Sequence, residues 1–330
     1  MLPWGDALRR VWLPRLHEVV GNPRLTDGIR HWINESSFQV YVAPTTSGFI
    51  LNYSDEMLVC DAFASETARF SRAAAETSST ITDVSRLPSS RAWQLIQWYY
   101  AAFYAAHALL RMCGIGLTYL EKGHASTIEE VSQLYGHPAA LVTSGFYIVT
   151  QAPLNPTYGR GLKFDKIVHS KGSHDELWTL FVNFLDARAG DVLSNQRLPQ
   201  REAQQISNEI SALARLLRRA PHLNGTWLSS IRNDVTYRHT RSAWHPWRPV
   251  NGLPSLREKY PEDMSDVSAQ IALAVGGASD LQRFRYACYS IVALCRVSCR
   301  EMITRCPLGR RKSFQAGALA ALDQLVAQRS

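Results

Sequence analysis

The stretch Trp98-Tyr-Tyr-Ala-Ala-Phe-Tyr-Ala-Ala-His-Ala-Leu-Leu-Arg111 belongs to the most strongly patterned helix that the sequence predicts. We expect this helix to cover residues 91–113 and to end before Gly114, because glycine commonly follows the last turn of a helix. Side chains at helical spacing form its wide apolar face, which is typical of a helix in the core of a bundle. They are Leu95, Trp98, Tyr99, Ala102, Phe103, Ala106, Leu109, Leu110 and Cys113. Three side chains beside this face either border a site or belong to the core: Tyr100, Tyr104 and His107.

Helical patterns dominate the chain from about residue 89 onward. Further helices are predicted at 126–135, 173–190, 199–220, 227–238, 281–305 and 313–328, with an acidic linker at 257–266. Strand patterns at 146–150 and 161–168 predict a β-hairpin inserted at about 140–170. The predicted fold class is therefore mainly α, with a helical bundle over residues 89–330 that carries this insertion.

The first 88 residues have a different pattern, which predicts a small α/β module. Its expected helices are 6–20 and 24–34, and its expected strands are 38–42, 49–53 and 57–60. A segment rich in Ser, Thr and Ala, residues 73–90, is expected to be a helix that runs into a linker. No residue of this module indicates what it does.

The clearest chemical pattern is Thr226-Trp-Leu-Ser-Ser-Ile-Arg-Asn-Asp-Val-Thr-Tyr-Arg-His239. Thr226 is a suitable N-cap, and the apolar residues that follow predict a helix over 227–238. Arg232 and His239 would then project from one face, about 10 Å apart along the helix axis. A guanidinium binds phosphate through a planar fork, and an imidazole can transfer a proton near pH 7. Asn233 adds an amide that can orient either partner.

This pattern resembles the R-N-x-x-x-x-x-H signature of the HEPN superfamily, a group of helical bundles that includes metal-independent ribonucleases of toxin and antiphage systems. The same Arg–His spacing occurs five times in the chain, but only at Arg232 does an Asn follow the Arg. The stretch from Trp98 to Arg111 is similar to the aromatic first helix of many members. The resemblance implies a helical bundle without a cofactor or metal, acting as a homodimer or with a partner chain that restrains or triggers it.

The resemblance also implies an endoribonuclease that acts through attack of a ribose 2′-OH on the adjacent phosphate. His239 would serve as general acid or base, Arg232 would stabilise charge on the phosphate, and Asn233 would position the site. Two alternatives remain open. The chain is either a non-catalytic, HEPN-like nucleotide-binding or nucleic-acid-binding adaptor in a defence complex, or a helical nucleic-acid-binding protein in which His239 only caps its helix.

The charge distribution favours a polyanionic partner. Residues 197–250 carry nine basic and three acidic side chains, and residues 281–330 carry nine and two. Aromatic and basic residues around the motif suit stacking and phosphate contacts with single-stranded RNA or tRNA. The expected RNA-binding residues are Tyr237, Arg238, Arg241, Trp244 and Arg248. Alternatively, the two Trp residues of the loop 241–248 would only pack this loop against the helical bundle.

Several other classes of protein are disfavoured by the sequence. No apolar run reaches the roughly 18 residues that a membrane span needs, and the N-terminus lacks the apolar core of a signal peptide, so a cytoplasmic protein is expected. Four cysteines follow a helical stripe rather than the paired spacing of a zinc site, and we expect buried thiols at a helix seam. They are Cys288, Cys295, Cys299 and Cys306. His169 and His174 lack companion ligands in the sequence, so no metal site is predicted.

Overall fold

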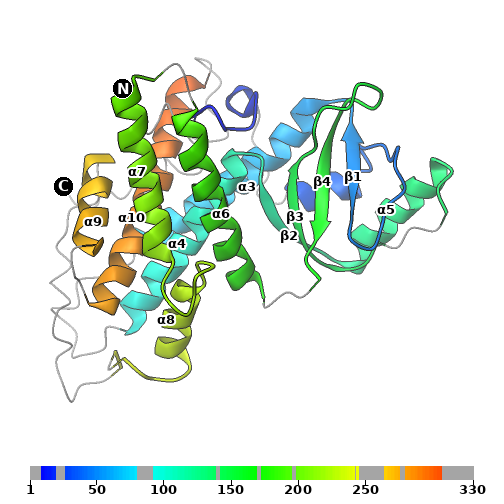
Figure 1. Ribbon diagram of the computed structural model, residues 1–330. Helices are drawn as coiled ribbons and strands as arrows, with labels where there is room; N and C mark the ends of the chain where they lie inside the picture. Colours follow the sequence, from blue (N-terminus) through cyan, green and yellow to red (C-terminus); the bar gives the residue numbers. More distant parts are fainter. Residues whose placement is uncertain are drawn as a thin grey trace.

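The computed structural model describes residues 9–19, 27–79, 92–138, 142–168, 172–194, 198–241, 243–244, 264–275 and 279–306. This part of the chain is mostly helical and contains one four-stranded antiparallel sheet, so the prediction of a mainly α protein is confirmed at that level. Helices gather at one end of the molecule and the sheet lies at the other (Figure 1). None of the described helices is both long enough and apolar enough to cross a membrane.

Helix α4 (Ala92–Met112) forms the centre of the helical part and confirms the helix predicted at 91–113. It packs against α3 (Glu56–Ser79), α6 (Ser173–Leu193), α8 (Trp227–Thr236) and α10 (Asp280–Arg305). Helices α7 (Gln200–Leu217) and α9 (Met264–Val275) complete this part by packing against each other and against α10. Cys288, Cys295 and Cys299 are buried free thiols on α10, as the stripe predicts, and Cys306 is half-buried.

The four strands follow the order β1-β4-β3-β2, with every neighbouring pair antiparallel. The hairpin predicted at about 140–170 is confirmed as β3 (Gly145–Gln151) and β4 (Arg160–Lys166). Its outer partners are β1 (Gly48–Tyr53) and β2 (Gly116–Leu120). The hairpin therefore shares one sheet with a strand of the N-terminal segment. The predicted domain boundary near residue 88 lies outside the described residues.

Two helices pack against each other beside this sheet, and both contact β2. They are α2 (Ile29–Asn34) and α5 (Lys122–Leu134), which correspond to the helices predicted at 24–34 and 126–135. A buried ion pair fixes this end of the molecule to the helices. Glu66 of α3 accepts from Arg111 Nε of α4 at 2.6 Å and from the backbone N–H of Ile29 at 3.1 Å. Arg111 also donates to the Leu117 carbonyl of β2 at 2.9 Å.

Three predictions for the N-terminal segment are wrong. Residues 38–42 make only an isolated bridge, Gln39 with Asn52, instead of a strand. Residues 57–60 are the first turns of α3, because their apolar side chains continue into the helical stripe that buries Phe63. Within residues 11–19 of the helix predicted at 6–20, the structure contains only the short 3-10 helix η1 (Leu16–Glu18). Pro14 explains this difference, since proline cannot donate the backbone hydrogen bond of a helix interior.

The remaining differences concern short elements and helix ends. Strand β2 and helix α9 were not predicted, and α9 begins inside the expected linker at 257–266, of which residues 257–263 lie outside the described residues. Helices α6, α7 and α10 agree with the predicted helices to within a few residues. The predicted helix 313–328 lies outside the described residues, as does the second half of the segment 73–90. Helix α8 ends at Thr236, short of the predicted residue 238.

Candidate functional site

Helix α8 is held in the bundle by an apolar face that contains Trp227, Leu228, Ile231 and Val235, all buried. Thr226 occupies the N-cap position as predicted, but its side chain makes no capping bond and its hydroxyl contacts Asn224 Oδ1 at 2.9 Å. The edge of this face that turns toward α4 carries Arg232. The motif thus lies on a short helix whose packing against α4 and α6 determines where its polar residues go.

Arg232 is buried, with only 8% of its surface exposed. Its guanidinium carbon lies 5.2 Å from the ring centroid of Tyr99 on α4 and 5.8 Å from that of Tyr237. Among the described residues its Nε atom has no hydrogen-bond partner, and the groups around the guanidinium are rings rather than carboxylates. Burial of a charge costs several kcal/mol, whereas a desolvated cation–π contact contributes about 2 kcal/mol. An anion that reaches this guanidinium therefore offsets part of the free-energy cost of burying its charge.

A polar cluster centred on the Tyr99 hydroxyl lies beside Arg232. This oxygen accepts from Trp178 Nε1 at 3.0 Å and lies 2.9 Å from His174 Nδ1 and 3.2 Å from Ser229 Oγ. Burial raises the pKa of the Tyr99 hydroxyl to about 12, so it keeps its proton at neutral pH. The cluster joins α4, α6 and α8 around one buried hydroxyl.

The imidazole of His174 stays uncharged at neutral pH. Burial and, after it, the positive charge of Arg232 together lower its pKa to about 4, against a smaller opposite effect of Asp175. The indole N–H of Trp178 can only donate, so the Tyr99 oxygen accepts that bond, and the Tyr99 hydroxyl proton has two neighbouring acceptors, His174 Nδ1 and Ser229 Oγ. When the Tyr99 hydroxyl donates to Nδ1, the single proton of the neutral imidazole lies on Nε2.

His239 does not share a helix face with Arg232, and the expected arrangement is wrong. Helix α8 ends three residues earlier, and His239 has a left-handed backbone with φ of 52°. Its side chain is exposed and stacks on Trp244, with ring centroids 5.5 Å apart and an interplanar angle of 25°. Trp244 in turn donates from its indole to the Val235 carbonyl and contacts Trp93 edge to face. The imidazole is thus held against the C-terminal end of α8.

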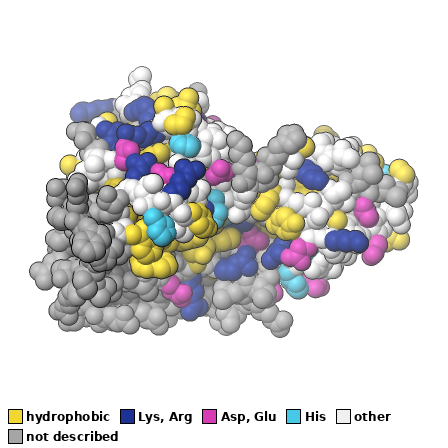
Figure 2. Space-filling model, turned by 90° about the horizontal axis from the view of Figure 1, so that it is seen from below, with side chains coloured by type: hydrophobic (Ala, Val, Ile, Leu, Met, Phe, Trp, Pro, Cys, Tyr) yellow, Lys and Arg dark blue, Asp and Glu magenta, His cyan; other side chains and the backbone are white. Residues whose placement is uncertain are grey.

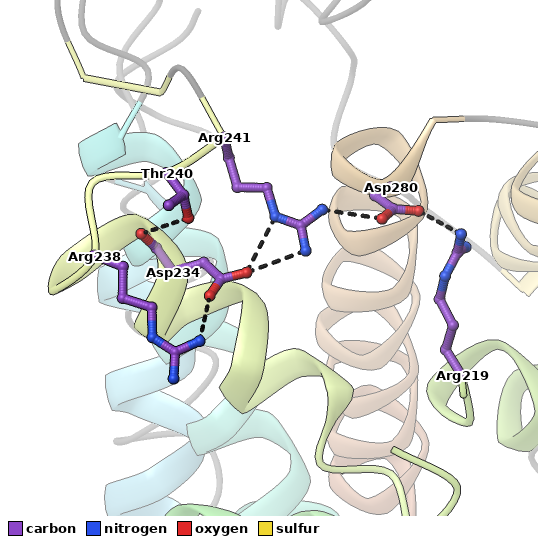
Figure 3. Close-up of polar contacts among 6 residues, drawn as sticks. All are labelled: Arg219, Asp234, Arg238, Thr240, Arg241 and Asp280. Carbon is purple, nitrogen blue, oxygen red and sulfur yellow. Dashed lines mark hydrogen bonds and ion pairs between the residues drawn. The ribbon is translucent and has the colours of Figure 1, made fainter. Parts of the chain in front are cut away.

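An ion-pair network fixes the segment that carries His239 (Figure 3). Asp234 accepts from Arg238 Nη1 and from Arg241 Nε, each at 3.1 Å, and its carbonyl accepts from the Thr240 backbone N–H at 3.1 Å. Arg241 also reaches Asp280 at the start of α10 at 3.0 Å, and Asp280 pairs with Arg219 at 2.6 Å. Three guanidinium groups therefore share two carboxylates. The network replaces the last predicted turn of α8 by a loop bound to α10.

The other predicted site residues lie around this loop. Asn233 is half-buried, and its carbonyl accepts from the backbone N–H of Tyr237 at 2.9 Å. The Tyr237 ring, which covers one side of Arg232, is 71% exposed. The side chain of Arg238 is 70% exposed and that of Arg241 is 31% exposed. Arg248 lies outside the described residues. On the face of the molecule seen from below in Figure 2, hydrophobic, basic and His side chains lie next to one another.

Four residues of the site were not identified from the sequence. Tyr99 lies in the apolar stripe that the sequence predicts for its helix, His174 lacks companion metal ligands, and Ser229 belongs to no recognisable motif. The fourth, Asp234, has a local signal, because an acidic residue four positions before Arg238 is a favourable pair at a helix surface. Of the residues beside the aromatic stripe, Tyr100 lies next to His174, with ring centroids 5.9 Å apart, whereas His107 is buried in the core.

Comparison of the chain with protein-family models, with curated proteins and with solved structures gives no match. The functional interpretation therefore rests on the geometry of Arg232, His239 and the residues that hold them.

Proposed function

We propose that this protein is an endoribonuclease that cleaves RNA without a metal ion, with Arg232 binding the phosphate and His239 transferring a proton. The observation that supports this proposal best is the buried guanidinium of Arg232, which is 8% exposed and lies against two rings. A phosphodiester oxygen would supply the negative charge that this guanidinium lacks among the described residues. The Tyr237 ring lies over the guanidinium and is exposed, so a phosphate reaches Arg232 once the ring turns aside.

The proposed reaction is a transesterification within the RNA strand. The ribose 2′-oxygen attacks the adjacent phosphorus, and the bond from phosphorus to the 5′-oxygen of the next nucleotide breaks. The 2′-OH loses a proton and the departing 5′-oxygen gains one, leaving a 2′,3′-cyclic phosphate and a 5′-OH. His239, exposed and held by Trp244, performs one of these proton transfers, while Arg232 stabilises the charge that develops on the phosphate.

The surroundings of the site suit an RNA strand as substrate. Arg238 is mostly exposed and contacts Asp234 through one nitrogen, which leaves further N–H groups for phosphate. The exposed Tyr237 ring offers a face for a base next to the phosphate on Arg232. The proposed RNA-binding surface also includes Arg241, Trp244 and Arg248, and Asn233 orients the site. As a toxin or defence effector, the chain would act with a second copy of itself or with a restraining partner.

A binding function without catalysis is the second candidate. It is favoured by the separation of the two motif residues, since no hydrogen bond or ring contact joins Arg232 to His239 in the described structure. The chain would then hold RNA or a nucleotide as an adaptor, with Arg232 as an anion site. The difference between the two candidates lies entirely in what His239 does.

Incubation of the purified chain with single-stranded RNA and tRNA in EDTA separates these functions. We expect the wild type to cleave RNA and His239→Asn to bind it without cleavage, because asparagine tolerates the left-handed backbone at this position. His31→Asn, at an exposed histidine of α2, is the matched control and should cleave like the wild type. Binding without cleavage by the wild type would favour the adaptor, and neither binding nor cleavage would overturn both candidates.

A further inference from the structure

We propose that His174 is a second anion-binding side chain of the Arg232 site, donating from Nε2 to an oxygen of the phosphate group and becoming protonated when that group binds. The inference depends on the proposed function only in taking Arg232 as the phosphate-binding residue. It adds a residue from a different helix, α6, to a site that the sequence motif confines to α8 and its following loop.

The first support is the shared contact with Tyr99. The guanidinium of Arg232 lies 5.2 Å from the centroid of the Tyr99 ring, and the Tyr99 hydroxyl lies 2.9 Å from His174 Nδ1. His174 is also packed against the Phe103 ring, with centroids 4.4 Å apart, so its orientation is fixed from two sides. The hydrogen bond with Tyr99 occupies Nδ1 and leaves Nε2 as the nitrogen for a ligand, and a protonated imidazole carries a donor N–H there.

The second support is the unbalanced charge of the cluster. The groups that face His174 are Asp175 on its own helix, Arg232 on α8, and Tyr99, Tyr100 and His107 on α4. Of these, Arg232 and Asp175 carry charge at neutral pH, and the charge of Arg232 has the larger effect on His174. Arg232 is more than nine-tenths buried, and its Nε atom is unpartnered among the described residues. A bound oxyanion reverses the local field, which removes the main electrostatic obstacle to a proton on His174.

This coupling makes anion affinity depend on pH. Without an anion the pKa of His174 is lowered to about 4, so the free protein does not take up the proton at pH 5.5. If a bound anion restores an ordinary imidazole pKa of about 6.5, the dissociation constant falls about tenfold between pH 7.5 and pH 5.5. Sulfate is a suitable probe because it keeps the same charge over this range, whereas inorganic phosphate itself titrates.

The test measures sulfate binding by calorimetry at pH 7.5, 6.5 and 5.5. We expect the wild type to bind about tenfold more tightly at the lowest pH. His174→Gln keeps an N–H donor that does not titrate, so it should bind within about threefold of the wild type at pH 7.5 and lose the pH dependence. His31→Gln, at an exposed histidine of α2, should keep the dependence. A wild-type affinity that is constant with pH, or an equal slope in His174→Gln, would overturn the inference.

A second measurement covers the case in which His174→Gln does not fold. The proton resonance of the His174 ring in the wild type reports its titration directly. Sulfate should raise its midpoint by one pH unit or more, and an unchanged midpoint in saturating sulfate contradicts the inference. Neither measurement uses RNA cleavage. If the chain cleaves no RNA but shows the sulfate effect, the proposed ribonuclease function is contradicted and this inference stands. If it cleaves RNA but shows no sulfate effect, this inference is contradicted and the ribonuclease function stands.

Discussion

The guanidinium of Arg232 lies 5.2 Å from the ring centroid of Tyr99, so the motif of α8 directly contacts the aromatic helix α4. The sequence marks these two stretches separately, more than a hundred residues apart. Their contact explains why Arg232 is buried rather than on the surface, and why its neighbours are rings. It also places Arg232 beside the polar cluster around the Tyr99 hydroxyl, so substitutions in this cluster test the function most directly.

The burial of Arg232 without an anionic partner predicts an unusual mutational result. Arg232→Met removes the charge and keeps a long flexible side chain, so the melting temperature should stay the same or rise, because an unpaired buried charge is costly. Binding of sulfate and cleavage of RNA should both be lost. Thermal unfolding and calorimetry check this, with Arg215→Met at an exposed position of α7 as the control. A sharp fall in melting temperature for Arg232→Met would make Arg232 a structural residue.

Asp234 is predicted to position His239 without contacting RNA. Asp234→Asn weakens the bonds to Arg238 and Arg241, and loss of such charged hydrogen bonds costs about 1–3 kcal/mol. We expect lower stability in urea unfolding and greatly reduced cleavage, because the loop that carries His239 loses its attachment. Asp280→Asn, which leaves Asp234 in place, should reduce cleavage less. Equal effects of the two changes would argue against a specific role of Asp234.

Trp244 should act on His239 by stacking. Trp244→Phe keeps a ring under the imidazole but loses the bond to the Val235 carbonyl, whereas Trp244→Leu loses both. Cleavage of single-stranded RNA should therefore fall in the order wild type, Phe variant, Leu variant, while sulfate binding at Arg232 changes little. The comparison uses initial cleavage rates on one oligonucleotide. A Leu variant as active as the wild type would separate Trp244 from the site.

Two imidazoles, the buried His107 and the half-buried His174, predict that the fold weakens in mild acid. Burial lowers the pKa of His174 to about 4 and lowers that of His107 well below its ordinary value. In the unfolded chain the pKa of both imidazoles is near the ordinary value of about 6.5. The unfolded chain therefore takes up more protons than the folded chain as the pH falls toward 4. Stability should therefore be complete above about pH 7 and decrease on acidification through this range.

Urea unfolding at pH 7.5 and pH 5.0 in chloride buffer measures this loss. His174→Gln should show a smaller difference between the two pH values than the wild type, while the exposed His31→Gln should show the same difference. Sulfate should reduce the loss in the wild type, because it favours the protonated form of His174. An equal difference in all three proteins would exclude His174 as a source of the acid sensitivity.

The elements with long, regular patterns were predicted well from the sequence. Helix α4 was recognised because its apolar side chains recur through six turns, and the β3–β4 hairpin because both strands alternate around a turn. The short apolar run at residues 57–60 is predicted as a strand but begins a helix, because four residues fit the side-chain spacing of a strand and of a helix equally well. Strand β2 is five residues long and pairs with β3, a partner that no local pattern identifies.

The candidate site was predictable only in part, for the same reason. The local motif indicates Arg232 and His239, but the loop after α8 is bound through Arg241 to Asp280, which lies 39 residues further along the sequence. The position of Arg232 depends on Tyr99, and that of His174 depends on Tyr99 and Phe103. Such contacts between distant segments have no signature in a single sequence. The catalytic role of the pair is still a prediction.

The chemical identity of the RNA ends tests the central proposal most directly. The wild type is incubated in EDTA with one single-stranded RNA that it cleaves, and the fragments are analysed by mass spectrometry. We predict a 2′,3′-cyclic phosphate on the 5′ fragment, a 5′-OH on the other, and no cleavage when the nucleotide at the cut carries 2′-deoxyribose. His239→Asn should leave the RNA intact. A requirement for Mg²⁺, fragments that carry a 5′-phosphate, or equal cleavage of the deoxy substrate would contradict the proposal, because water or a metal hydroxide would then be the nucleophile.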